Sequence, residues 1–137
     1  MSSADSKSNK KAFLIEIVED DASLANVLQD KFKLEGFDVS IAKEGEEGLA
    51  IALSKRPDLI LLDIMMPKMD GLEMMKKLRN GDEWGKNVPI ILLTNLSADD
   101  ERINWAIAEN APAYYLMKSN WTINDLVDKI RERLSRK

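Results

Sequence analysis

The chain has 137 residues, 45% of them hydrophobic and 32% charged, and its formal net charge is -4. This size and composition predict one folded globular domain, and the acidic balance argues against a nucleic-acid-binding surface. Cysteine and histidine are absent, which excludes disulfides, thiol nucleophiles, imidazole bases and Cys/His metal sites and makes an oxygen-preferring cation such as Mg²⁺ the natural metal.

The chain opens on a polar stretch, SSADSKSNKK, which has basic residues but no apolar centre and so does not match a signal peptide. We expect residues 1–10 to form a flexible tail and residues 11–137 to form the folded domain. No apolar run approaches the roughly 20 residues that a membrane span needs. We therefore expect a cytoplasmic protein without membrane attachment.

In the first half of the chain, apolar β-rich runs alternate with segments of helical periodicity. In chain order we expect a strand at 12–18, a helix at 22–35, a strand at 37–42, a helix at 44–55 and a strand at 59–63. Gly36 and Pro57 end the two helices, and Asp21 is expected to cap the first one.

The same alternation continues in the second half. We expect a helix at 70–80, a loop at 81–87, a strand at 88–94, a helix at 98–109, a strand at 113–117 and an amphipathic helix at 122–134. The pair Asp70-Gly71 marks a turn and the start of its helix. Continuously apolar strands separated by helices predict an α/β fold, a doubly wound (βα)5 unit with a five-stranded parallel sheet covered on both faces.

Polar side chains gather where these strands end, and the carboxyl ends of parallel strands are where α/β folds place function. They are Glu19, Asp20 and Asp21 after the first strand, Asp63 on the third, Thr94 on the fourth and Lys118 after the fifth. Asp63 therefore faces at least one other acid. Like charges that close require a cation or a raised pKa, and a divalent ion with a lysine beside it would supply the positive charge.

At five separated places the chain resembles a receiver domain of the two-component response-regulator family, which is CheY-like. The matching stretches are Val18-Glu19-Asp20-Asp21, Leu62-Asp63-Ile64-Met65-Met66-Pro67, Met69-Asp70-Gly71, Leu93-Thr94 and Tyr115-Leu116-Met117-Lys118. Their joint order and spacing on a (βα)5 pattern carry the resemblance, which covers residues 11 to 136. It implies a flavodoxin-like strand order, 2-1-3-4-5.

The resemblance also implies roles for the acids at the strand ends. Asp63 would be the phosphoacceptor, which attacks the phosphoryl group carried by a phosphohistidine. Glu19 and Asp20 would hold Mg²⁺, or Mn²⁺ in its place, together with Asp63 and the backbone carbonyl of Met65. Phosphoryl transfer depends on positioning and charge neutralisation, so a metal-activated carboxylate suits a chain without histidine.

Three further residues receive roles by the same resemblance. Lys118 and Thr94 would bind the phosphoryl oxygens. Movement of Thr94 would let Tyr115 rotate and reshape the face formed by the fourth helix, fifth strand and fifth helix of the (βα)5 unit. Static core packing of Tyr115 is an open alternative.

The resemblance implies a signalling domain rather than an enzyme, with a sensor histidine kinase or phosphotransfer protein as phosphoryl donor. A downstream protein target or an output domain would receive the signal, with the chain as a monomer or a phosphorylation-dependent dimer. Neither a nucleic acid nor a membrane is expected as a partner of this chain. A phosphohydrolase with a strand-end Asp nucleophile is a rival, but Met65 stands where such enzymes carry a second Asp.

Several positions depart from the family pattern. Ser119 follows Lys118 where a proline is usual, and Asn95 follows Thr94 where a small residue is usual. These departures keep open a degenerate receiver that acts as an adaptor without phosphorylation. Met65 and Leu96, two residues beyond the acceptor and the threonine, are apolar and unable to orient a water, which predicts a slowly hydrolysing aspartyl phosphate.

Overall fold

The computed structural model describes residues 12–66, 68–94, 108, 114–117 and 121–135, with the backbone alone at residues 94 and 114–117. Its strands are β2 (Leu14–Val18), β3 (Asp38–Ala42), β4 (Leu59–Asp63), β5 (Ile90–Thr94) and β6 (Tyr114–Met117). Its helices are α1 (Ala22–Leu34), α2 (Gly45–Lys55), α3 (Gly71–Arg79), α4 (Glu83–Asn87) and α6 (Ile123–Leu134).

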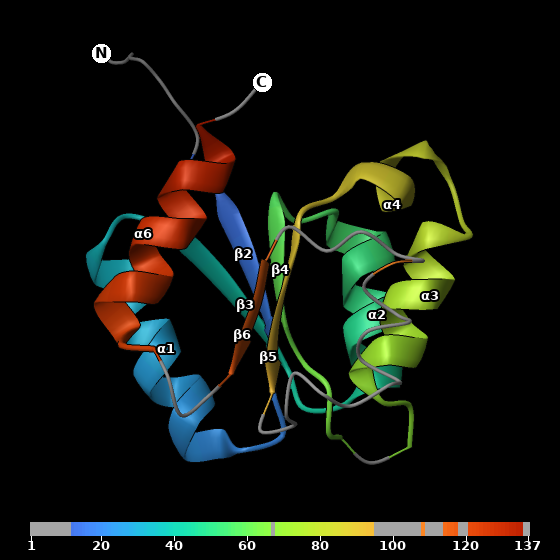
Figure 1. Ribbon diagram of the computed structural model, residues 1–137, viewed down its shortest axis with the longest axis horizontal. Coiled ribbons are helices and arrows are strands. Elements are labelled where there is room, and N and C mark those ends of the chain that lie inside the picture. Colours follow the sequence, from blue (N-terminus) through green and yellow to red (C-terminus); the bar gives the residue numbers. More distant parts are fainter. Residues whose placement is uncertain (1–11, 67, 95–107, 109–113, 118–120, 136–137) are drawn as a thin grey trace.

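All neighbouring strands run parallel in one five-stranded sheet of order β3-β2-β4-β5-β6. Counted along the chain this is the order 2-1-3-4-5, so the expected doubly wound α/β fold is confirmed. Helices α1 and α6 lie on one face of the sheet, and α2 and α3 lie on the other (Figure 1). The expected helix at 98–109 lies outside the described residues except for Ala108, which is helical.

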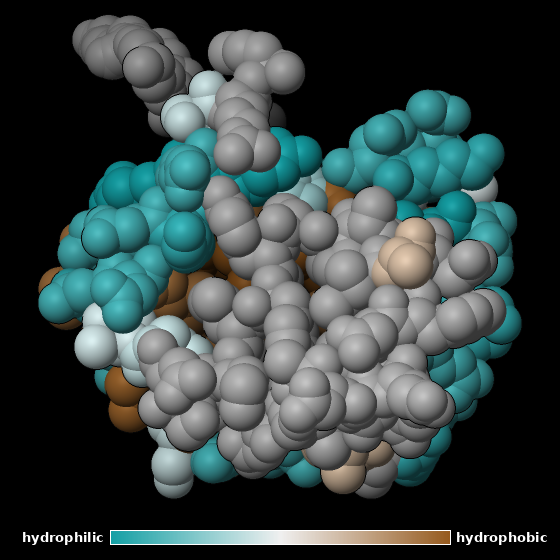
Figure 2. Space-filling model, in the orientation of Figure 1, coloured by the Kyte–Doolittle hydropathy of each residue, from teal (hydrophilic) through white to brown (hydrophobic). Residues whose placement is uncertain are grey.

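Two hydrophobic clusters fill the space between the sheet and its helices. The cluster on the α1 and α6 side includes Ile15 and Ile17 of β2, and the cluster on the α2 and α3 side includes Val18. Every residue of β4 is buried, because the strand is central and both its faces are covered. The helices turn charged residues outward, and the visible surface over α6 and near α4 is hydrophilic (Figure 2).

Side-chain caps fix where the described helices begin. Asp21 accepts a hydrogen bond from the Leu24 amide at 3.2 Å, and Asp70 accepts one from the Glu73 amide at 2.9 Å. Both satisfy an amide that has no partner within its helix. The expected cap at Asp21 and the expected helix start at Asp70 are therefore confirmed.

The expected loop at 81–87 is wrong, because this segment contains the short helix α4. Asp82 caps it, accepting a hydrogen bond from the Gly85 amide at 2.9 Å. Arg79 of α3 donates hydrogen bonds to the carbonyls of Gly85 (2.8 Å) and Val88 (2.9 Å). One turn of helix is too short to show periodicity, and tertiary contacts of this kind are invisible in the sequence.

Among the described residues, no helix is both long enough and apolar enough to cross a membrane.

The cap of α4 yields a test of its own. Asp82→Ala removes both the acceptor for the Gly85 amide and the partner of Arg56, whose Nη2 lies 2.7 Å from Asp82 Oδ2. We expect the free energy of unfolding to fall by about 1–2 kcal/mol. Asp82→Asn keeps a capping oxygen and loses the ion pair, so its loss should stay below about 1 kcal/mol. Urea unfolding measures both, and equal losses would contradict a stabilising cap.

Candidate functional site

Asp63 ends the central strand β4 and is almost completely buried, with 3% of its surface exposed. Its Oδ1 accepts a hydrogen bond from the Met65 amide at 3.3 Å. Register pairs Asp63 with Leu93 of β5 and the preceding Leu62 with Val18 of β2. The side chain therefore lies at the carboxyl edge of the sheet, between the ends of the two neighbouring strands.

Glu19 and Asp20 follow directly after β2 and meet Asp63 at this edge. One carboxylate oxygen from each of the three acids lies within 4.8 Å of the others. Glu19 is buried, with 2% exposed, and its amide donates a hydrogen bond to the Ala42 carbonyl at 3.0 Å. Its Oε2 accepts one from the Asp21 amide at 3.1 Å. The two acids thus reach the site from backbone that β3 and the start of α1 hold in place.

The donor set of this cluster fits a hard divalent cation. It offers three carboxylates and no nitrogen or sulfur ligand, and such oxygen donors suit Mg²⁺ or Mn²⁺. Acids held this close repel one another unless positive charge lies between or beside them. Asp20 is exposed while its two neighbours are buried, so the cluster has one side open to solvent.

The segment after β4 is fixed by close backbone approaches that the sequence reading treated only as a turn. At Gly71, an added Cβ would collide with the Asp63 carbonyl, and at Gly45 it would collide with the Met69 carbonyl. Lys68 adopts a left-handed backbone with φ 65°, and its Nζ lies 3.3 Å from Glu44 Oε2. The glycine of Met69-Asp70-Gly71 was the available signal for this contact.

Glu44 links this segment to the first turn of α2. Its Oε1 accepts a hydrogen bond from the Glu47 amide at 2.8 Å, while its Oε2 pairs with Lys68. The amide hydrogen bond, followed by the smaller effect of Lys68, lowers the pKa of Glu44. The β4–α3 segment is therefore tied to α2 by one carboxylate that uses its two oxygens separately.

The remaining residues expected at the site are described only in part. Met65 is 53% exposed beside Asp63. Thr94 is the last residue of β5 and pairs with Met117 of β6, and Tyr115 pairs with Leu92. The backbone thus places Thr94 at the same sheet edge as the acids. Lys118, Asn95, Leu96 and Ser119 lie outside the described residues, as does Trp105.

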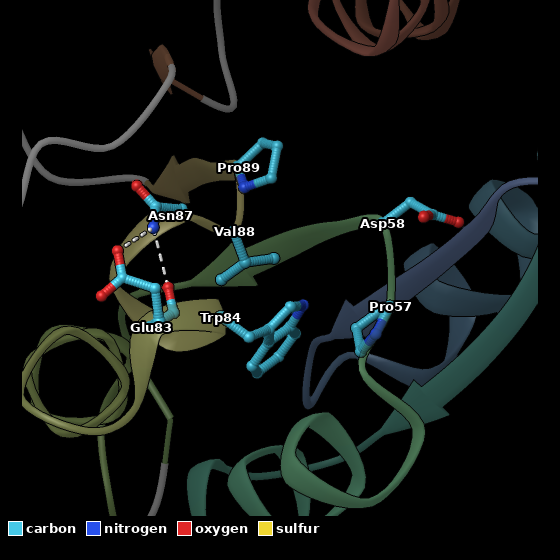
Figure 3. A pocket seen from close by; sticks show the side chains of 7 residues that line it. All are labelled: Pro57, Asp58, Glu83, Trp84, Asn87, Val88 and Pro89. Atoms are coloured by element: carbon cyan, nitrogen blue, oxygen red, sulfur yellow. Dashed lines mark hydrogen bonds between the residues drawn. The ribbon is translucent and has the colours of Figure 1, made fainter. Parts of the chain in front are cut away.

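A separate surface pocket of about 370 Å³ lies at the opposite, amino edge of the sheet. Pro57 and Asp58 precede β4, Val88 and Pro89 precede β5, and the Trp84 indole of α4 points between these segments (Figure 3). None of the three clustered acids lines it. The pocket and the acidic cluster are therefore distinct features of the fold.

The fold and the acidic edge define a class of signalling domain, and sequence comparison agrees. Residues 15–131 match the response regulator receiver domain. The chain belongs to this family. It is a receiver of the two-component response-regulator type, and the resemblance found in its motifs is confirmed.

Curated relatives extend beyond the part that this chain matches. Response regulator MprA of Mycolicibacterium vanbaalenii is 34% identical over 120 residues, which are 88% of this chain and 49% of the relative. The alkaline phosphatase synthesis transcriptional regulatory protein PhoP of Bacillus subtilis is 42% identical over 96 residues, 70% of this chain and 36% of PhoP. This chain thus spans about half or less of these two relatives.

Solved receivers have the same fold over nearly their whole length. A CheY-like receiver from Methanospirillum hungatei has a TM-score of 0.81 at 27% identity, covering 90% of this chain and 94% of its own. The receiver of a signal transduction histidine kinase from Syntrophus aciditrophicus has a TM-score of 0.80 at 30% identity, covering 90% and 91%. Receivers thus occur both in regulators and within a kinase.

Repulsion among the three acids predicts that Asp20→Asn stabilises the metal-free protein but reduces the stability gained on adding Mg²⁺. In EDTA, Asp20→Asn should raise stability by about 1 kcal/mol, a few degrees in Tm, because it removes one of three neighbouring charges. With Mg²⁺ added, the wild type should gain stability by binding, and the variant should gain less. Thermal unfolding measures both effects.

Asp30→Asn on the exposed surface of α1 is the matched control and should change neither value. A lower Tm of Asp20→Asn in EDTA, together with an unchanged Mg²⁺ response, would contradict an acidic metal site.

Proposed function

We propose that this receiver accepts a phosphoryl group on Asp63 from a phosphohistidine of a sensor histidine kinase or phosphotransfer protein. The observation that carries the proposal is the cluster of Glu19, Asp20 and Asp63 at the carboxyl edge of a receiver fold. An oxygen of Asp63 attacks phosphorus and forms an O–P bond while the P–N bond of the donor breaks. The bonding electrons leave with the imidazole, which takes up a proton.

The residues around Asp63 have different roles in this proposal. Glu19 and Asp20, with Asp63 itself and the Met65 carbonyl, are the residues that would hold Mg²⁺ or Mn²⁺. The bound ion supplies the positive charge that offsets the acids and the phosphoryl oxygens. The Met65 amide, which donates to Asp63 Oδ1 at 3.3 Å, orients the carboxylate. Burial of Asp63 keeps competing water from most of its surface.

We further propose that Thr94 and Lys118 bind the phosphoryl oxygens. Tyr115 then transmits the conformational change that follows phosphorylation. The placement of Thr94 at the end of β5, one residue beyond the partner of Asp63, supports its part. We propose residues 11–137 as the receiver and 1–10 as its tail, acting in the cytoplasm. Its chemistry is limited to its own phosphorylation and dephosphorylation, and a downstream protein or output domain reads the state.

Phosphorylation is tested by intact mass after incubation with acetyl phosphate. We expect a gain of one phosphoryl group that requires Mg²⁺ and is absent in Asp63→Asn, because the amide is a poor nucleophile. Asp58→Asn, at the opposite edge of the sheet, should be phosphorylated like the wild type. If neither acetyl phosphate nor a purified sensor kinase phosphorylates the wild type, the proposal is wrong, and an adaptor that acts without phosphorylation replaces it.

The lifetime of the aspartyl phosphate tests the role of Met65. A thioether cannot orient an attacking water, so we expect slow hydrolysis in the wild type and severalfold faster hydrolysis in Met65→Gln, whose amide can hold a water. Leu53→Gln, at an equally exposed apolar position on α2, is the control. Loss of phosphoryl label over time gives the rates, and a wild-type half-life of seconds would contradict the hypothesis.

A further inference from the structure

An acid lies in the middle of the buried strand β2. Glu16 has 0% of its surface exposed and stands between Ile15 and Ile17. Those two side chains pack toward α1 and α6, and side chains alternate along a strand, so Glu16 faces the α2 side of the sheet. Glu16 is thus placed inside the core, three residues before the acidic edge begins.

Three buried oxygen atoms at this position have no hydrogen-bond partner among the described residues. In the register of the sheet, Glu16 stands opposite Ser40 of β3 and Ile60 of β4. Within the described part of the chain, both carboxyl oxygens of Glu16 and the Ser40 hydroxyl oxygen are buried without a hydrogen bond. Native cores rarely leave such groups unpaired, because each one costs free energy. Three unpaired oxygens side by side therefore require an explanation.

The charged groups facing Glu16 come from α2, the helix that packs against this part of the sheet. The pKa of Glu16 is raised to about 8, first by burial and then by the charge of Glu47, while Lys55 acts in the opposite direction. From β3 and β4 the register partners are Ser40 and Ile60, neither of which titrates. Glu16 is therefore neutral through most of the range below pH 8.

Ionising Glu16 places a charge beneath α2 that the site can accommodate only by opening to water. The segment best able to move is β3 with α2, because β3 is an edge strand that pairs with β2 alone. This segment also supports the acidic edge, since the Ala42 carbonyl accepts the hydrogen bond from the Glu19 amide.

We propose that Glu16, buried beside Ser40, acts as a proton-dependent latch: its neutral carboxyl lets β3 and α2 stay closed on the sheet, and its ionisation releases them. Stability contributed by the latch is fully present below the ordinary glutamate pKa of 4.5 and declines with rising pH until the folded-state pKa is passed. Loosened β3 would in turn weaken the hold on Glu19, a consequence that rests on the proposed function.

Hydrogen exchange of metal-free, unphosphorylated protein tests the latch directly. Wild type and Glu16→Gln are compared at each pH from about 6 to about 9.5, so that the intrinsic pH dependence of exchange cancels in their ratio. We expect protection of α2 and β3 amides in the wild type, relative to the variant, to fall about tenfold or more across this range. Amides of α6 should keep a constant ratio.

Two charge controls sharpen the result. In the wild type, Glu47 Oε1 accepts a hydrogen bond from the Lys43 amide at 2.8 Å. Glu47→Gln keeps an oxygen for this hydrogen bond but removes the charge that raises the pKa of Glu16. It should lower the pKa of Glu16 and so shift the loss of protection to lower pH. Glu73→Gln, at an exposed position of α3, removes a comparable charge from elsewhere and should leave the pH dependence unchanged.

Carbon-13 NMR titration of the wild-type Glu16 carboxyl keeps the proposal testable if Glu16→Gln does not fold. A midpoint well above that of the exposed glutamates supports the latch, and a midpoint in their ordinary range overturns it. A flat protection ratio for α2 and β3 also overturns it. Because these measurements use neither metal nor phosphoryl donor, failure here would leave the phosphorylation of Asp63 untouched.

Discussion

A carboxylate at the end of a fully buried strand is the constraint on which the rest of this structure depends. Burying Asp63 costs free energy unless charge and hydrogen bonds compensate it. The parallel sheet solves this by ending β4 between β2 and β5, so that backbone amides, neighbouring acids and the open side at Asp20 converge there. The same sheet that buries the strand therefore brings three acids together at one edge, and the proposed phosphorylation of Asp63 depends on this arrangement.

Close backbone contacts confine the segment near Asp63. Gly71 brings the start of α3 against the Asp63 carbonyl, and Gly45 brings the start of α2 against Met69. The intervening segment is thereby confined at two points, and the Lys68–Glu44 pair adds a third contact. A segment held in this way can present its amides and carbonyls at fixed positions, which electrostatic catalysis requires.

Much of this could be predicted from the sequence, because strong signals set it. The continuous apolar runs gave the parallel sheet, and the acids at strand ends gave the candidate site, since both follow from periodicity and strand direction. Helix α4 could not be predicted, because it is one turn long and Arg79 stabilises it by side-chain hydrogen bonds to carbonyls six and nine residues later. The tie between Lys68 and Glu44 was missed for the same reason: residues 24 apart meet only in the fold.

Glu16 was also missed, since a single acid within an apolar strand changes no periodicity. Its contrast with Asp63 shows how position along a strand decides what a buried acid does. Asp63, at the strand end, accepts a hydrogen bond from the Met65 amide and lies beside two other acids, so its burial is compatible with the proposed phosphoryl binding. Glu16, three residues before the acidic turn that follows its own strand β2, faces α2 and Ser40 without a hydrogen bond in the described core. At this position burial costs least free energy when the carboxyl stays protonated. Because packing favours the protonated form, loss of the proton must in turn disturb the packing.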